Sequence, residues 1–156
     1  MVPPPQLLIQ MAFLFKYSEI NLMFITYPQP NGQVAVVIPT GDVNDAIKNV
    51  PQGVEYKIVE SVDIDNDYFN AYEFDAELGA KVNIEKAKAI HLDKFRSARA
   101  PKLQKLDIDF MKAAESNDEE KKAEIVSAKQ ALRDVTLTPL PDDLAGIKAT
   151  WPDILN

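Results

Sequence analysis

The spacing of apolar residues between positions 84 and 113 is that of one long amphipathic helix. At about 100° per residue, the same side of such a helix returns every three or four residues. The positions on that side are Ile84, Ala87, His91, Phe95, Ala98, Leu103, Leu106, Phe110 and Ala113. Asn83 is a suitable N-cap before this run. The phase is unchanged after Pro101, so the pattern predicts either one helix kinked there or two nearly collinear helices, the second starting at the proline.

A second helix is predicted from about Glu119 to Arg133. Residues 116–118, Ser-Asn-Asp, favour a turn before it, and Ile125, Ala128 and Leu132 mark its buried side. Two helices joined by so short a loop are expected to pack antiparallel, as a helical hairpin. Their apolar sides are unequal, so the hairpin would leave an apolar surface for the N-terminal sheet or another subunit to cover.

Residues 23–82 have the pattern of short strands instead. The runs "MFITY" and "VAVVI" are rich in aromatic and β-branched residues, and the intervening "PQPNGQ" predicts a hairpin, because Asn31 and Gly32 both tolerate positive φ. Asp42 is placed to cap a short helix, and "VEYKIVE" predicts a third strand. We therefore predict an α+β protein, with a small N-terminal β-sheet and short helix over residues 23–82 and the helical hairpin over residues 83–134.

A segment rich in proline, residues 135–156, follows the hairpin. Asp142 is expected to cap a short helix that runs through Lys148. Trp151, Ile154 and Leu155 are expected to dock on the body of the protein. The alternative is a peptide-like tail that a partner binds.

Residues 1–22 form an N-terminal extension, and the sequence leaves open whether it is native or ordered, since the strand pattern begins at Met23. Its apolar run, Leu7 to Phe15, is far short of the roughly 20 residues that span a bilayer. No basic residue precedes this run, which disfavours a secretory signal. We expect no membrane association.

The composition excludes several kinds of site. The 156 residues include no cysteine, so disulfides and thiolate metal sites are excluded, and one histidine cannot build a multi-histidine zinc site. The formal charge of −7 argues against nonspecific binding to nucleic acid. We expect no cofactor and no nucleic-acid partner. The charge is −7 over residues 1–83, +3 over 84–133 and −3 over 134–156, which supports divisions near Asn83 and Asp134.

Two stretches hold candidate chemistry. Asp63, Asp65 and Asp67 have the spacing of the first three ligands of an EF-hand, but Tyr68 and Phe74 stand where the loop needs glycine and glutamate. A solvated acidic loop is therefore the better interpretation, followed by a segment that packs its aromatic side chains.

His91 lies inside the apolar stripe, so a core or interface histidine with a local hydrogen bond is favoured over a catalytic one. Asp93 with Arg96, and Lys105 with Asp109, are spaced to form surface ion pairs. The stem of Arg99 is expected to pack on the stripe while its guanidinium reaches an acid of a neighbouring element. Alternatively, the basic residues of this helix form a patch for an acidic partner; they are Arg96, Arg99, Lys102 and Lys105.

Five stretches, in order, resemble a family of small proteins of tailed bacteriophages and prophages, often encoded among the tail and tail-fibre genes. These stretches are "FITYPQPNGQVAVVIPTGD", "VPQGVEYKIVESVDI", "FNAYEFD", "IHLDKFRSARAPKLQKLDIDFMKAAESND" and "AEIVSAKQALRDVT". The resemblance runs from Met23 to Leu155, and "IHLDKFRSAR" and "KQALRDVT" are its most distinctive parts. The family offers no established catalytic residues to carry over.

The resemblance implies a tail or tail-fibre accessory protein that acts by protein–protein interaction in the host cytoplasm during assembly, as an assembly chaperone or as a minor virion component, and not an enzyme. The expected partner is a phage tail or tail-fibre protein, and a homo-oligomer stays open. The candidate partner-binding residues are His91, Phe95, Arg96, Arg99, Leu106 and Phe110. The alternatives are an acidic inhibitor of a host protein, using the stretch Asp63 to Glu77, and a small hydrolase using His91 and an aspartate.

Overall fold

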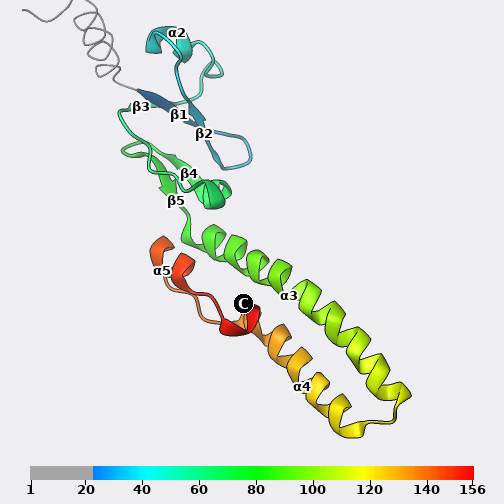
Figure 1. The fold of residues 1–156 in the computed structure, drawn as a ribbon. Helices are drawn as coiled ribbons and strands as arrows, with labels where there is room; N and C mark the ends of the chain where they lie inside the picture. Colours follow the sequence, from blue (N-terminus) through cyan, green and yellow to red (C-terminus); the bar gives the residue numbers. More distant parts are fainter. Residues whose placement is uncertain (1–22) are drawn as a thin grey trace, which may run out of the picture. The chain divides into compact units, whose positions relative to one another are not determined.

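A computed structural model describes residues 23–156 of the chain, so the expectations on residues 1–22 lie outside the described part. The described residues form two compact units. Unit 1 comprises residues 23–64 and 73–81, and unit 2 comprises residues 65–72 and 82–156. The predicted α+β class is confirmed (Figure 1). The sequence predicted one border between the two parts, near Asn83. The structure differs in one respect, because residues 65–72 belong to unit 2, together with the helices.

Unit 1 is built on a three-stranded antiparallel sheet in the order β2-β1-β3 (Figure 1). The strands are β1 (Phe24–Pro28), β2 (Val34–Val37) and β3 (Lys57–Val59). Helix α2 (Val43–Ile47) follows β2, and Asp42 caps it as predicted by accepting a hydrogen bond from the N–H of Asn44. Ile25 and Thr26 point to opposite faces of the middle strand and both are fully buried, so both faces of β1 are covered.

The β1–β2 hairpin turns differently from the two-residue Asn-Gly turn that the sequence suggested. The N–H of Gly32 donates to the carbonyl of Gln29 at 2.9 Å, and the N–H of Gln29 donates to the carbonyl of Gln33 at 2.8 Å. Only Gly32 has positive φ, at 78°. The reason is Pro30, whose fixed φ suits the second position of an ordinary type I turn. The loop therefore has three residues and ends in a glycine bulge.

A second hairpin, absent from the prediction, joins β4 (Tyr72–Asp75) to β5 (Gly79–Val82). Gly79 has φ of 82°, and a β-carbon there would lie 2.9 Å from Thr26 Oγ1 and 3.0 Å from Val59 Cγ1. Glycine is needed both for the backbone conformation and for the close approach of this turn to β1 and β3.

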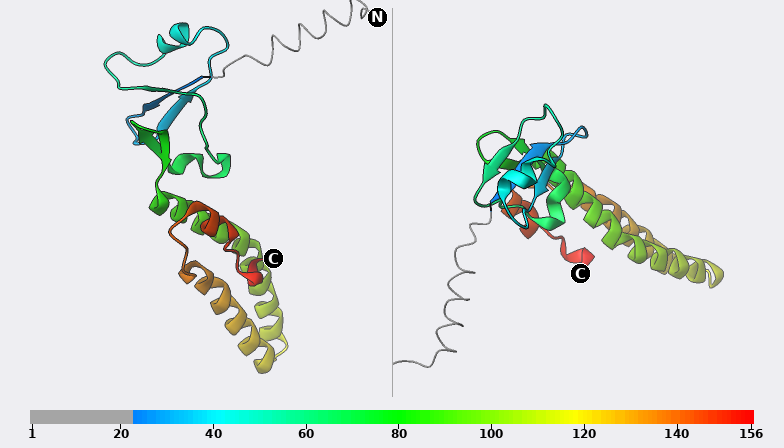
Figure 2. Two further views of the ribbon diagram at one scale, coloured as in Figure 1. Left: turned by 90° about the vertical axis from the view of Figure 1, so that its left-hand side faces the viewer. Right: turned by 90° about the horizontal axis from the view of Figure 1, so that it is seen from above.

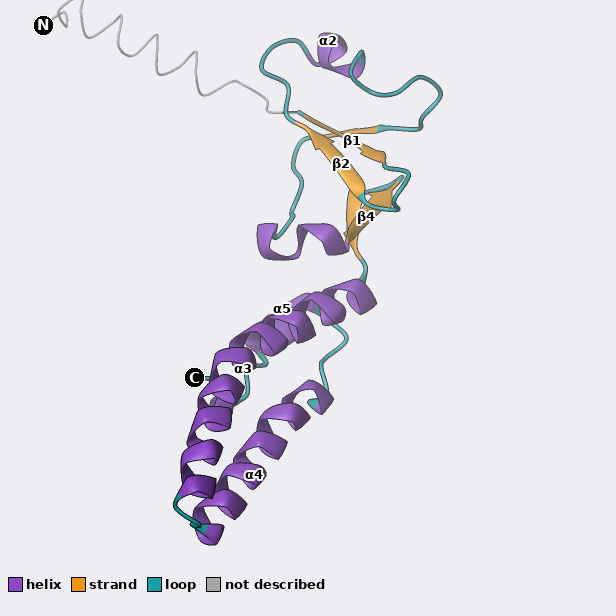
Figure 3. Cartoon of the chain, turned by 90° about the vertical axis from the view of Figure 1, so that its right-hand side faces the viewer, coloured by secondary structure: helices purple, strands orange, loops and turns teal. Residues whose placement is uncertain are grey.

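Unit 2 is a helical hairpin with short elements packed along it (Figure 2). Its elements are the 3-10 turn η1 (Asn66–Ala71), α3 (Ile84–Glu115), α4 (Glu119–Asp134), the turn η2 (Val135–Leu137), α5 (Leu144–Ala149) and the turn η3 (Asp153–Leu155). Helix α3 continues through Pro101 as a single helix, which decides between the two predicted alternatives. Helices α3 and α4 run antiparallel, as predicted (Figure 3).

The loop between α3 and α4 is short and consists of residues 116–118. Asn117 takes the left-handed conformation, with φ of 53°. Its N–H donates to the carbonyl of Ala114 at 3.2 Å, and the N–H of Asp118 donates to the carbonyl of Ala113 at 2.9 Å. This pair of bonds is a Schellman motif. Asp118 also caps α4, because its carboxylate accepts from the N–H of Lys121 at 2.9 Å.

The core of unit 2 contains Phe95 of α3, Leu132 of α4, Val135 of η2 and Leu155 of η3, all buried. Further apolar side chains pack against this cluster; they are Leu92, Ala98, Leu103, Leu106 and Leu140. Each buried side chain of this size contributes roughly 1.5–3 kcal/mol. The apolar surface left over by the hairpin is thus covered by the C-terminal segment of the same chain, which lies along α3 (Figure 2).

The C-terminal helix begins one residue later than predicted. Asp143, not Asp142, caps α5 by accepting from the N–H of Gly146 at 2.7 Å. Asp142 instead forms an ion pair with Lys88 at 2.6 Å. Of the three residues expected to dock, Leu155 is buried, and Trp151 packs edge-on against Phe95 with ring centroids 5.3 Å apart but stays 38% exposed. The third, Ile154, is exposed.

Among residues 23–156, no helix combines the length and the apolar character that crossing a bilayer requires.

Replacing Asn117 by alanine should lower the free energy of unfolding of unit 2 by about 1 kcal/mol, because the asparagine side chain eases the left-handed conformation through local hydrogen bonds that alanine cannot form. Asn117→Gly should leave the stability unchanged or raise it. Urea denaturation followed by the fluorescence of Trp151, the single tryptophan of the chain, measures both. Equal stability of the alanine and glycine variants would contradict the role assigned to the loop.

Candidate functional site

The single histidine of the chain is a buried hydrogen-bonded residue of unit 2. His91 is 2% exposed. Its Nδ1 lies 2.6 Å from the hydroxyl oxygen of Tyr68, and its Nε2 lies 2.7 Å from the carbonyl oxygen of Thr150. Because a carbonyl oxygen can only accept, Nε2 carries a proton and donates to Thr150; Nδ1, when it carries no proton, accepts from the Tyr68 hydroxyl. The prediction of a core histidine with local hydrogen bonds is confirmed.

Aromatic rings surround His91. The Phe95 ring centroid is 4.8 Å from that of His91 in an edge-on arrangement, and the Trp151 centroid is 6.1 Å away. The ammonium of Lys94 lies 4.2 Å from the centre of the Tyr68 ring, within the range of a cation–π contact. Segments from η1, α3 and the C-terminal end therefore meet at this one side chain. Its two hydrogen-bond partners are a phenol and a backbone carbonyl, not the aspartate that the hydrolase hypothesis requires.

Ion pairs at the surface join the same segments of unit 2. Asp65 pairs with Lys148 of α5, and Asp67 pairs with Lys94 at 3.4 Å. The hydrogen bond from Lys148 holds the pKa of the Asp65 carboxyl below its ordinary value, and Asp65 raises the pKa of Lys148. Asp65 also caps η1, accepting from the N–H of Asp67 at 2.9 Å. These contacts occupy two of the three aspartates that resembled calcium ligands.

No group of three or more acidic or histidine side chains suited to a metal ion occurs within residues 23–156.

The arginines predicted to bind a partner have different surroundings. Arg96 forms the expected exposed ion pair with Asp93, and Lys105 pairs with Asp109 at 2.7 Å, as predicted. The guanidinium of Arg99 reaches a neighbouring element, but it meets a backbone carbonyl, that of Arg133 at 2.8 Å, instead of an acid. A cation at the C-terminal end of α4 satisfies unpaired carbonyls there and interacts favourably with the helix dipole.

The remaining candidates, all on α3, are used mainly inside unit 2. Phe95 is fully buried and is not accessible to a partner, and Leu106 is partly buried against the core cluster. His91 is likewise enclosed. Phe110 is partly exposed, and the ammonium of Lys129 lies 5.7 Å from its ring centre. Of the six candidates, Arg96 is exposed, and Arg99, Leu106 and Phe110 are partly exposed.

An exposed apolar surface lies elsewhere on the hairpin. Ile108, Met111 and Val126 are 55%, 63% and 54% exposed, and we call them the tip surface. Asp107 of α3 pairs with Lys129 of α4, which marks one side of the hairpin. Met111 follows Asp107 by one helical turn and Val126 precedes Lys129 by nearly one turn, so in an antiparallel hairpin both lie on that side, nearer the loop. Ile108 precedes Met111 by three residues on α3 and lies farther around the helix from Asp107.

The sequence held a signal for the tip surface. Ile108 and Met111 lie outside the apolar stripe that predicts the buried side of α3, so their exposure follows from the same periodicity. Large apolar residues on the solvent side of a helix are common singly, but a group of them marks a candidate contact surface.

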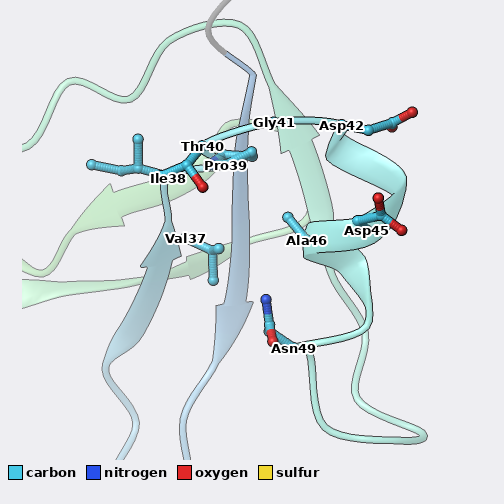
Figure 4. A pocket seen from close by; sticks show the side chains of 9 residues that line it. All are labelled: Val37, Ile38, Pro39, Thr40, Gly41, Asp42, Asp45, Ala46 and Asn49. Carbon is cyan, nitrogen blue, oxygen red and sulfur yellow. The ribbon is translucent and has the colours of Figure 1, made fainter.

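Unit 1 has an open hollow between the end of β2 and α2 (Figure 4). Its lining residues are Val37, Ile38, Pro39, Thr40, Gly41, Asp42, Asp45, Ala46 and Asn49. Asp42 is used as the cap of α2, and Asp45 pairs with Lys48 at 2.6 Å. These partners leave no side-chain constellation in the hollow that indicates a particular reaction.

Comparison of the chain with protein-family models, with curated proteins and with solved structures finds no match. The resemblance to phage tail-region proteins therefore stays a prediction from the sequence.

Replacing Tyr68 by phenylalanine should lower the free energy of unfolding of unit 2 by about 1–3 kcal/mol, because it leaves the buried Nδ1 of His91 without a donor. A double-mutant cycle with His91→Phe should give a coupling energy of at least about 0.5 kcal/mol. Denaturation followed by Trp151 fluorescence measures the free energies of unfolding from which this coupling energy is calculated. Tyr56→Phe, at an exposed tyrosine of unit 1, serves as the control and should have no effect. If Tyr68→Phe left the free energy of unfolding unchanged, the hydrogen bond between the Tyr68 hydroxyl and Nδ1 of His91 would not contribute to stability.

Proposed function

We propose that the chain is a tail-associated accessory protein of a tailed bacteriophage or prophage, which acts by binding another protein. Its partner would be a tail or tail-fibre polypeptide, which it assists in assembly as a chaperone or accompanies as a minor virion component. Two observations support the proposal. The first is the resemblance of residues 23–155 to proteins of the tail region. The second is the tip surface.

The tip surface has the chemical character of a contact site. Charged side chains of the same helices lie close to it in sequence and form the ion pairs of Lys129 with Asp107 and of Lys122 with Glu119. An apolar centre with a charged rim is the usual anatomy of a protein–protein interface. Covering these side chains on a partner would be favourable by roughly 25 cal/mol for each Å² of apolar surface removed from water. A chaperone that masks an exposed apolar surface of an unassembled partner would use the same interaction.

The structure changes which residues of the hairpin would make this contact. Phe95 is buried in the core of unit 2, so changing it to a charged residue would destabilise the fold and would not test binding. The proposed contact surface consists of the tip surface, with the partly exposed Phe110 beside it on α3.

Changing Met111 and Val126 to glutamate should abolish capture of the tail partner while leaving the fold intact, because both side chains are exposed. The double variant and the parent chain would be co-expressed with the neighbouring tail and fibre genes of the source genome, purified, and compared by mass spectrometry. We expect recovery of one tail or fibre polypeptide to fall at least about tenfold, as for loss of a central interface contact.

Leu137→Glu is the matched control, since Leu137 is also an exposed apolar residue of unit 2 but lies outside the tip surface. It should leave the recovery unchanged. Circular dichroism melting should show the same transition for all three chains. Unchanged recovery with the double variant would exclude the tip surface, and failure of the parent chain to capture any tail or fibre polypeptide would contradict the proposed function.

An acidic inhibitor of a host protein is the alternative, and the charge of unit 1 favours it. The described residues of this unit include eight acidic and three basic side chains. The stretch first considered for this role is partly neutralised, however, because Lys148 and Lys94 pair with Asp65 and Asp67. A salt-sensitive complex with a host nuclease, formed without any other phage protein, would support the inhibitor over the tail accessory protein.

A further inference from the structure

The turn between β1 and β2 contains the single Asn-Gly pair of the chain, Asn31 and Gly32. Both residues are exposed. An asparagine before a glycine is prone to spontaneous deamidation, because the backbone nitrogen of the next residue attacks the side-chain amide and glycine has no β-carbon to obstruct that approach. Each of the other asparagines within residues 23–155 is followed by a residue that has a β-carbon.

The reaction needs no reagent except water. The Gly32 nitrogen gives up its proton and forms a bond to Cγ of Asn31, the bond from Cγ to Nδ2 breaks, and ammonia leaves. This ring closure is fast in a flexible chain because the two groups belong to neighbouring residues. Water then opens the cyclic imide at one of its two carbonyls, which gives aspartate or isoaspartate. Nothing is oxidised or reduced.

The structure holds each of the three reacting groups in a hydrogen bond. The N–H of Gly32, which must become the nucleophile, donates to the carbonyl of Gln29 at 2.9 Å. The side-chain oxygen Oδ1 of Asn31 accepts from the N–H of Gln33 at 3.0 Å, and the leaving nitrogen Nδ2 donates to Oε1 of Gln33 at 2.7 Å. These bonds have to break before the ring can close, so they oppose the reaction in the folded hairpin.

We propose that Asn31 is the main site of spontaneous deamidation in residues 23–156, and that the β1–β2 turn controls its rate by holding these three groups. In the folded chain the reaction proceeds through local opening of the hairpin tip. The reaction does not depend on the proposed function of the chain.

The modification changes the turn and the charge of unit 1. A carboxylate at position 31 cannot donate to Oε1 of Gln33, and it adds a negative charge to a unit that already has more acidic than basic side chains. Isoaspartate in addition lengthens the main chain inside the turn that fixes the register of β1 and β2. Both products therefore weaken the hairpin.

The test uses the full chain, incubated at mildly alkaline pH either folded or unfolded in guanidinium chloride. Mass spectrometry of its peptides locates each converted asparagine and separates aspartate from isoaspartate. In the denaturant, Asn31 should react at least about tenfold faster than any other asparagine and should give both products. In the folded chain, Asn31 should react at least about tenfold more slowly than in the denaturant, because the turn has to open first.

Two glutamine variants test the contact that the structure assigns to the turn. Gln33→Ala removes the Oε1 acceptor and keeps the backbone N–H, so Asn31 of the folded variant should react about three- to tenfold faster than in the parent. Gln29→Ala is the matched control, because it removes a glutamine side chain from the same turn but keeps the carbonyl that holds Gly32. It should react like the parent. Circular dichroism checks that both variants are folded.

Faster reaction at another asparagine in the denaturant, or the absence of isoaspartate from the products, would overturn the assignment of the site. Equal rates at Asn31 in the folded and unfolded chains would overturn the role of the turn. So would an unchanged rate in folded Gln33→Ala.

Discussion

Unit 2 depends on one buried polar side chain. A histidine inside an apolar core is stable only when both ring nitrogens have partners, and the lack of one costs about 1–3 kcal/mol. The partners of His91 come from 23 residues before it, the Tyr68 hydroxyl, and from 59 residues after it, the Thr150 carbonyl. The two hydrogen bonds therefore require η1 and the C-terminal segment to lie against α3. Once Thr150 is held there, Trp151 and Leu155 can pack against Phe95 and its neighbours.

This arrangement has a direct consequence for function. In unit 2, the C-terminal segment of the chain covers the apolar side chains of α3 that α4 leaves uncovered. The large apolar side chains of unit 2 that stay exposed include the tip surface, Leu137 and Ile154, and a partner would have to contact these.

The local features of the fold could be predicted from the sequence, and the non-local ones could not. The period of apolar residues predicts α3, and Asn83 and Asp42 act as caps because capping depends on neighbours in sequence. Asp142 and Asp143 are both suitable N-caps by local sequence. Asp143 caps the helix in the structure, while Asp142 pairs with Lys88, 54 residues away. The β4–β5 hairpin was missed because it depends on the fit of Gly79 against Thr26 and Val59. Phe95 was predicted to contact a partner for the same reason, because the residues that pack over it, Leu155 and Trp151, are distant in the sequence.

The account is tested most directly by the protonation of the His91 ring, observed by nitrogen-15 NMR of histidine-labelled protein. There is one histidine, so the spectrum needs no assignment. The account predicts a proton on Nε2 that exchanges slowly with water, because this N–H is buried and bonded to Thr150. An Nε2 without a proton, or an Nε2–H that exchanges as fast as in a free peptide, would show that His91 does not hold the C-terminal segment in place.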